Sequence, residues 1–106
     1  MRGGKLVRDK IPNIIAAETG KSVAVKILSD VDYDNELERK LDEEVLEFHD
    51  GGDVEELVDI LEVVIALAAH QGVTCDQLGS KVLAKRRERG SFDKRYFLVE
   101  EDRFND

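Results

Sequence analysis

Two short motifs near the middle of the chain each hold a pair of acidic residues three positions apart, Glu44-Val-Leu-Glu47 and Glu56-Leu-Val-Asp59. Side chains at positions i and i+3 lie about 5–6 Å apart on one face of an α-helix. Two such helices packed antiparallel could therefore direct all four carboxylates towards one point. Carboxylate oxygens at this density suit a hard divalent cation such as Mg²⁺, so we predict a metal site at these four acids.

Glu44 is the least ordinary of the four, because it projects into an apolar stripe. On a helical wheel at 100° per residue, Leu37, Leu41 and Phe48 fall within about 40° of one another, and Glu44 projects on the same face, about 20° from Leu37. A carboxylate on an apolar face must be paired, protonated or bound to a metal, since an unpaired buried carboxylate costs several kcal/mol. This position favours a metal role over a surface role.

Two of the other acids have structural explanations that the sequence leaves open. Asp53-Val-Glu-Glu56 fits a capping box, in which the Glu56 carboxylate would accept a hydrogen bond from the Asp53 backbone. Glu47 could form a surface ion pair with Lys40. Only eight residues separate Glu47 from Glu56, so the turn between the two helices must be tight, and Glu56 is the acid most open to a capping role.

The chain has 106 residues, enough for one domain spanning 1–106, and a net charge of −8. That charge argues against a nucleic-acid-binding protein, because a phosphate backbone requires a cationic surface. The bases are concentrated at 81–95, where seven lysines and arginines face two acids. An acidic part that could hold a metal is thus separate from a basic part that could hold phosphate, although a salt-bridged surface is the alternative.

Apolar periodicity and turn signals predict an all-α fold, an antiparallel helical bundle with short extended N- and C-terminal arms. We expect a short helix over 12–19 ending at Gly20, a long one starting within 30–34 and ending near 49, and another over about 54–71. The Thr74 to Gln77 capping-box pattern begins a last helix that runs to about 89. Residues 21–29 alternate and should form an extended segment or short strand, 91–99 should form an extended arm, and the tail after 100 should fray.

The predicted helix over 54–71 is apolar almost all round, which is typical of the central helix of a bundle. We expect it to be a buried core helix that packs against a second copy of the chain, giving a homo-oligomer. Its apolar run from Leu57 to Ala69 is interrupted by two acids and is shorter than the roughly 20 residues of a membrane span. With no visible secretion signal and a single cysteine, Cys75, we expect a cytoplasmic protein without membrane partners.

The acidic motifs resemble a known family signature. Glu43-Glu44-x-x-Glu47 followed by Glu56-x-x-Asp59 is similar to the signature of the MazG-like, all-α nucleoside triphosphate pyrophosphohydrolases, a superfamily that also includes phosphoribosyl-ATP pyrophosphohydrolase and dUTPase-type enzymes. The flanks resemble one small branch, through Lys5-Leu-Val-Arg-Asp-Lys-Ile-Pro12, Lys40-Leu-Asp-Glu-Glu44, and Lys85-Arg-Arg-Glu-Arg-Gly-Ser-Phe92 with Lys94-Arg95. The resemblance spans about residues 5–98.

This resemblance implies a dimeric or tetrameric helical bundle that hydrolyses a nucleoside triphosphate to the monophosphate and pyrophosphate. It implies Mg²⁺, which Mn²⁺ could replace, bound by Glu44, Glu47, Glu56 and Asp59, with Glu44 and Glu47 as the catalytic pair. Positive charge must hold the triphosphate, and the candidates are Arg8, Lys10, Lys85, Arg89 and Arg95, some of them reaching across a subunit boundary.

Two alternative functions stay open on the sequence alone. One is phosphoribosyl-ATP pyrophosphohydrolase activity, and the other is a non-catalytic oligomeric module that binds a nucleotide or a protein. The base of the nucleotide is also undetermined, because it would depend on pocket residues such as Tyr33, Phe92 or Tyr96, whose positions the sequence does not fix.

Overall fold

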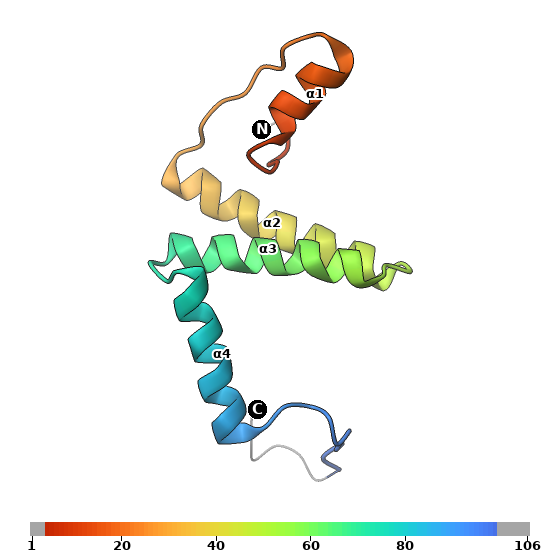
Figure 1. Ribbon diagram of the computed structural model, residues 1–106, viewed down its shortest axis with the longest axis vertical. Coiled ribbons are helices and arrows are strands. Elements are labelled where there is room, and N and C mark those ends of the chain that lie inside the picture. Colours follow the sequence, from red (N-terminus) through yellow and green to blue (C-terminus); the bar gives the residue numbers. More distant parts are fainter. Residues whose placement is uncertain (1–3, 100–106) are drawn as a thin grey trace.

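A computed structural model describes residues 4–99, which form four helices and no strand (Figure 1). They are α1 (Ile11–Thr19), α2 (Asp30–His49), α3 (Val54–His70) and α4 (Cys75–Arg89). The all-α prediction is confirmed, and the helix bounds agree closely with those expected. Residues 21–29 are an extended connection rather than a strand, 91–99 are an irregular arm, and the tail expected to fray lies outside the described residues.

The helices begin and end where their local chemistry requires. Ser29 caps α2, since its hydroxyl accepts a hydrogen bond of 3.2 Å from the Asp32 backbone N–H. Thr74 and Gln77 form the predicted capping box of α4, with reciprocal hydrogen bonds of 3.1 and 2.9 Å. Gly20 ends α1 in the left-handed conformation, with φ of 74°, which a residue without a Cβ adopts easily.

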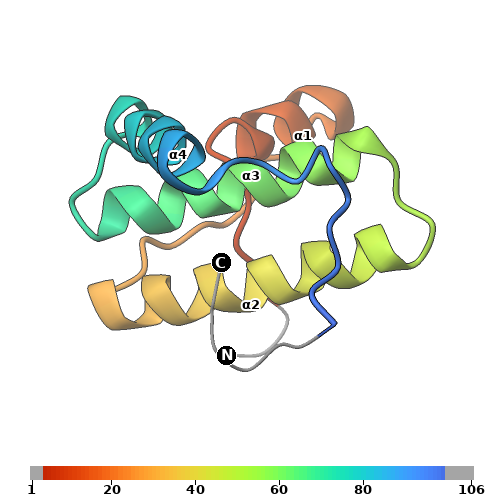
Figure 2. The same cartoon turned by 90° about the horizontal axis from the view of Figure 1, so that it is seen from below.

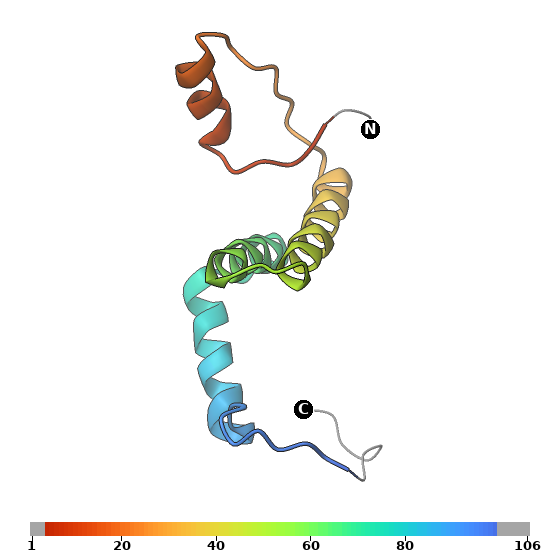
Figure 3. The ribbon, with the colours of Figure 1, turned by 90° about the vertical axis from the view of Figure 1, so that its right-hand side faces the viewer.

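An antiparallel hairpin of α2 and α3 forms the centre of the molecule (Figure 2). Figures 1 and 3 show α1 on one side of this hairpin and α4 on the other, and α4 packs only against α3. The radius of gyration is 17.9 Å, whereas a compact domain of this length would have about 13 Å. The chain is therefore a central hairpin from which α1 and α4 project on opposite sides.

The hairpin buries little apolar surface within one chain. Among the described residues Leu37 is the only buried apolar side chain, and Leu57, Val58 and Leu61 of α3 are 45, 49 and 54% exposed. Within a single chain α3 is therefore not a buried core helix, and its packing against a second copy stays a prediction. The reason is geometric, because α2 covers one face of α3 and α4 turns away from it.

Within residues 4–99, no single helix is both long enough and apolar enough to cross a membrane. The pair α3 and α4 meets the length and composition requirement only when the two are taken together, and this pair is bent by 106°.

Candidate metal centre and adjoining cavity

The hairpin brings the predicted metal ligands together from two helices. Glu44 on α2 and Glu56 and Asp59 on α3 each contribute a carboxylate oxygen to a group in which all three atoms lie within 4.8 Å of one another. A second group with the same spacing joins Glu44 to Glu43 and Glu47 on α2. The four predicted acids thus fall in two overlapping groups that share Glu44. Glu43 also belongs to one of these groups, although the sequence indicated it only as part of the family signature.

Two oxygens in this cluster have no hydrogen-bond partner. Glu44 is buried, with 6% of its surface exposed, and its Oε2 atom is unpaired within the described part of the chain. The Oε2 atom of Glu56 is also buried and unpaired. Because water cannot reach these oxygens, they require a proton or a cation. The donor set therefore fits a hard divalent cation on the evidence of the unpaired atoms themselves.

Electrostatics in the cluster act most strongly on Glu56. Removal of its carboxyl group from water, the adjoining Glu44 carboxyl group, and the negative charges of Glu47, Glu44 and Asp59 raise the pKa of Glu56 from 4.5 to about 7. Near neutral pH the metal-free cluster therefore holds a proton on a large fraction of the molecules. A divalent cation would compete with that proton for the same oxygens.

Glu56 does not cap α3, so the capping-box interpretation is wrong. The Asp53 side chain accepts a hydrogen bond of 3.0 Å from the Glu55 backbone N–H, and the Glu56 carboxyl group is turned into the cluster. The tight turn before α3 depends on Gly52. A Cβ atom there would lie 2.7 Å from both the Cγ atom of Glu56 and the Cα atom of Phe48. The short spacing between Glu47 and Glu56, which left the role of Glu56 as a metal ligand open, is thus accommodated by a glycine in the turn.

Lys40 supplies a positive charge beside the buried acid. Its Nζ atom lies 3.6 Å from Oε1 of Glu44 and 3.6 Å from an oxygen of Glu43. The predicted surface pair between Lys40 and Glu47 is absent from the described part of the structure. The i,i+4 spacing of Lys40 and Glu44 on α2 could have predicted the ion pair between these two residues.

The N-terminal segment brings a second cation to the cluster. The Arg8 guanidinium donates a hydrogen bond of 2.8 Å to Oδ1 of Asp59, although the two residues are 51 positions apart in the sequence. Arg8 was predicted as a phosphate contact, and the structure places it directly beside a predicted metal ligand. Nothing in the sequence spacing indicated that these two residues would meet.

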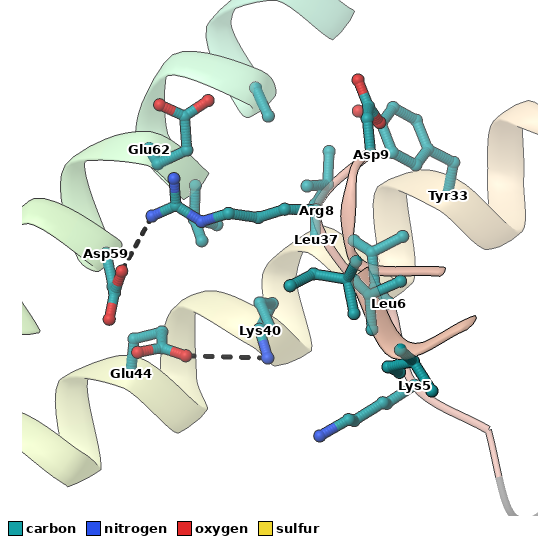
Figure 4. A pocket seen from close by; sticks show the side chains of 15 residues that line it. Lys5, Leu6, Arg8, Asp9, Tyr33, Leu37, Lys40, Glu44, Asp59 and Glu62 are labelled. Carbon is teal, nitrogen blue, oxygen red and sulfur yellow. Dashed lines mark hydrogen bonds and ion pairs between the residues drawn. The ribbon is translucent and has the colours of Figure 1, made fainter. Parts of the chain in front are cut away.

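A cavity of about 520 Å³ adjoins the acids (Figure 4). Its volume lies within the range of small-molecule binding sites. The N-terminal segment and α1 form one side, and α2 and α3 form the other. The lining side chains are Lys5, Leu6, Val7, Arg8, Asp9, Ile11, Ile15, Tyr33, Leu37, Lys40, Glu44, Asp59, Glu62, Val63 and Ala66.

This lining includes polar residues that sequence reasoning missed. Lys5 and Asp9 line the cavity from the N-terminal segment, and Glu62 lines it from α3. Glu62 was recognisable in principle, because it follows Asp59 by three residues on the same helical face. Of the three aromatic residues considered for base recognition, Tyr33 lines the cavity, whereas Phe92 and Tyr96 lie in the C-terminal arm and are more than 80% exposed.

The other predicted phosphate contacts lie elsewhere within one chain. Lys10 precedes α1 and does not line the cavity. Lys85 and Arg89 belong to α4 and Arg95 to the arm that follows it, on the side of the hairpin opposite α1 (Figure 3). Of the five candidates, the single chain therefore brings Arg8 alone to the acids.

No family model, curated protein or solved structure matches this chain. The site itself combines converging carboxylates, two unpaired buried oxygens and a cavity that carries lysine and arginine side chains. Such a combination can bind a divalent cation together with an anionic ligand.

Proposed function

We propose that this protein is a Mg²⁺-dependent nucleoside triphosphate pyrophosphohydrolase of the MazG-like type, which converts a nucleoside triphosphate to the monophosphate and pyrophosphate. The observation that carries the proposal is the pair of unpaired, buried Oε2 atoms on Glu44 and Glu56, beside the carboxylate of Asp59. A purely structural acid cluster would be expected to satisfy those oxygens with protein donors.

Glu44, Glu56 and Asp59 would hold the cation, with Glu47 at the edge of the cluster, and Mn²⁺ should be able to replace Mg²⁺. When bound, Mg²⁺ neutralises charge on phosphate oxygens and on the leaving pyrophosphate. The chain's own contribution would be to fix these carboxylates on two packed helices, so that little reorganisation is needed when the charge develops.

Glu47 is the residue best placed to accept a proton from the attacking water. It is exposed, so water can reach its carboxylate, and it belongs to the same oxygen group as the buried Glu44. Arg8 and Lys40 would hold the phosphates. Both already lie within ion-pair distance of a cluster carboxylate, at 2.8 and 3.6 Å, and can turn towards a phosphate oxygen.

A panel of ribo- and deoxyribonucleoside triphosphates tests the proposal, with release of pyrophosphate as the readout in the presence of Mg²⁺, of Mn²⁺ or of a chelator. We expect turnover of at least one triphosphate that requires the cation, and loss of that turnover in Glu44→Gln. Neutralising one of several clustered acids relieves repulsion, so metal-free Glu44→Gln should melt no lower than the wild type.

Asp42→Asn is the matched control, because Asp42 is an exposed acid of α2 outside both oxygen groups and should tolerate the change. Full activity of Glu44→Gln would contradict the metal assignment. Absence of turnover with every triphosphate would instead favour a non-catalytic module.

A further inference from the structure

Residues 4–20, which we call the N-terminal strap, are attached to the hairpin through few contacts. Within the described part of the chain, α1 has no close backbone contact with another helix, and none of its residues is buried. Figures 1 and 3 show α1 standing clear of α2 and α3. The strap meets the hairpin through side chains that line the cavity, such as Leu6, Ile11 and Ile15, and these stay partly exposed. Loss of a single contact should therefore favour an undocked strap.

One polar contact holds the strap to the hairpin. The hydrogen bond of 2.8 Å from Nη2 of Arg8 to Oδ1 of Asp59 is the only hydrogen bond or ion pair between the strap and the hairpin among residues 4–99. Figure 4 shows the Arg8 side chain extended from the strap towards α3, with Asp59 and Glu62 near its guanidinium. The acceptor of this one polar contact is thus a proposed metal ligand.

A divalent cation at the acids would act against this ion pair in two ways. It would share the charge of Asp59, which offers one of three oxygens that lie within 4.8 Å of one another, and so weaken the attraction for Arg8. It would also repel the guanidinium. Because Mg²⁺ binds oxygen at about 2.1 Å, a cation on the oxygen that accepts from Arg8 would lie within about 5 Å of the guanidinium nitrogen. The cation and Arg8 therefore oppose each other at Asp59.

We infer that the N-terminal strap is a metal-operated lid on the cavity. A divalent cation at the acids releases Arg8 from Asp59 and undocks the strap, and a polyphosphate bound by that cation docks the strap again through Arg8. The inference rests on the proposed function, which supplies the cation and the phosphate contact, and it adds an order of events. The cation binds first, the ligand enters on the side that the strap has left, and the freed guanidinium then donates to phosphate oxygens.

The helix α1 reports the position of the strap. It has nine residues, and a helix of this length is marginal in water without tertiary contacts. Undocking should therefore raise the rate at which the backbone amides of α1 exchange with solvent deuterium. Exchange measured over 11–19 follows the strap without any need for turnover. The amides of α4, on the other side of the hairpin, are the internal reference.

Mg²⁺ and a polyphosphate should shift this exchange in opposite directions. Saturating Mg²⁺, with its binding established by calorimetric titration, should speed exchange in α1 of the wild type about two- to fivefold, the factor that one exposed ion pair contributes, and leave α4 unchanged. Inorganic triphosphate added with excess Mg²⁺ should slow the exchange again. In Arg8→Ala, exchange in α1 should already be faster without Mg²⁺, and neither addition should alter it.

Lys21→Ala is the matched control. It removes a positive charge just after α1, and the only hydrogen bonds of Lys21 in the described structure are made by its backbone atoms. This variant should keep both responses of the wild type. The wild-type measurement decides the question even if Arg8→Ala does not fold, because the inference requires α1 to respond to Mg²⁺.

Mg²⁺ binding that leaves exchange in α1 unchanged or slower overturns the inference, because Arg8 would then stay on the hairpin beside the cation. A full Mg²⁺ response in Arg8→Ala overturns it as well, and absence of Mg²⁺ binding removes the inference together with the metal site. Failure of the proposed function is read separately, from release of pyrophosphate. A protein whose α1 responds as expected but that hydrolyses no nucleoside triphosphate keeps the lid and loses the enzymatic assignment, and a hydrolase with an unresponsive α1 does the reverse.

Discussion

The Arg8 guanidinium lies 2.8 Å from the Asp59 carboxylate, so the N-terminal segment places a positive charge inside the acid cluster of the α2–α3 hairpin. Both side chains are about half exposed, and an ion pair of this kind contributes roughly 0.2–1 kcal/mol. Its importance lies in its position. The guanidinium offsets the repulsion among the acids, and it would compete with the proposed divalent cation for Asp59.

Arg8→Ala should therefore have two opposite effects. Without nucleotide, the affinity for Mg²⁺ should rise about two- to fivefold, because a competing cation of this strength has been removed. With nucleotide, kcat/KM should fall about tenfold or more, because the proposed charge-assisted contact between Arg8 and a phosphate would be lost. Calorimetric titration with Mg²⁺ and steady-state kinetics measure the two effects.

Arg39→Ala is the control for this experiment. Arg39 forms a comparable surface pair of 3.2 Å with Glu36, away from the cluster, and its removal should change neither quantity. An unchanged Mg²⁺ affinity in Arg8→Ala would mean that the Arg8–Asp59 contact does not oppose metal binding.

The raised pKa of Glu56 predicts how stability depends on pH. With a pKa of about 7 in the folded state and 4.5 as its ordinary value, Glu56 binds a proton more tightly when the protein is folded. Its contribution to the free energy of unfolding is therefore complete below pH 4.5 and is lost as the pH rises through about 7. The melting temperature of the metal-free protein should decline over this interval, and saturating Mg²⁺ should oppose the decline, because the cation takes the place of the proton.

Glu56→Gln should flatten this part of the pH profile, since the amide does not titrate. Glu55→Gln is the matched control, because Glu55 is exposed in the same first turn of α3 and lies outside the oxygen groups, so it should leave the slope in place. Thermal melts between pH 4.5 and 8 make the comparison. The same slope in Glu56→Gln as in the wild type would show that other groups carry it.

Gly52→Ala should damage both the hairpin and the metal site. The new Cβ atom would lie 2.7 Å from the Phe48 backbone as well as from the Glu56 side chain, so the turn itself must move. We expect a loss of about 1–3 kcal/mol in the free energy of unfolding and weaker Mg²⁺ binding. Gly79→Ala is the control, since a Cβ atom there meets open space within α4, and it should stabilise the protein by about 0.5–1 kcal/mol. Chemical denaturation and calorimetry would show whether the two glycines differ in this way.

The helices could be predicted from the sequence because their determinants are local. The Ser29 cap, the Thr74 to Gln77 capping box and the glycines after α1 and α4 act within a few residues of themselves. The same holds for the acids on each helix, whose i,i+3 spacing fixes a common face. Their convergence required only that α2 and α3 pack antiparallel, which a short turn enforces.

The remaining features depend on contacts between distant segments. The sequence pattern carries no signal that Arg8 reaches Asp59, because the path of the N-terminal segment is set by the whole cavity rather than by spacing. The placement of Tyr33 in that cavity likewise depends on how the N-terminal segment packs near α2 and α3. The apolar circumference of α3 predicts that this helix is buried, but the single chain leaves side chains such as Leu61 half exposed.

This exposed face of α3 predicts that the protein is at least a dimer at micromolar concentration. Leu57, Val58 and Leu61 present apolar surface that α2 and α4 leave uncovered, and burying such surface drives association. Light scattering coupled to gel filtration should give at least twice the chain mass of 12.0 kDa, and Leu61→Lys should weaken the assembly. A mass of one chain for the wild type under these conditions would leave the face without a partner.

The basic residues of α4 and the following arm should act on the site of a neighbouring subunit. Within one chain, the acids lie apart from three basic residues, Lys85, Arg89 and Arg95. These residues could contact a phosphate bound at the acids only if a second copy of the chain brings them there. Arg95→Ala should lower kcat/KM roughly ten- to a hundredfold, the effect of losing one charge-assisted contact. Its Mg²⁺ affinity without nucleotide should be unchanged, because Arg95 is not among the proposed metal ligands.

Mixed oligomers of Glu44→Gln and Arg95→Ala distinguish a shared site from a surface role. Each variant alone lacks one half of every site, but a mixed dimer would pair the intact acids of one chain with the intact Arg95 of the other. Equal mixing after reversible unfolding should therefore restore about a quarter of the wild-type activity, since half of the dimers are mixed and each has one complete site. If mixing restores nothing while mixed dimers form, both halves of the site come from one chain. If Arg95→Ala alone keeps full activity and melts lower, the basic residues serve the fold through ion pairs and the phosphates are held by the Arg8 side of the cavity.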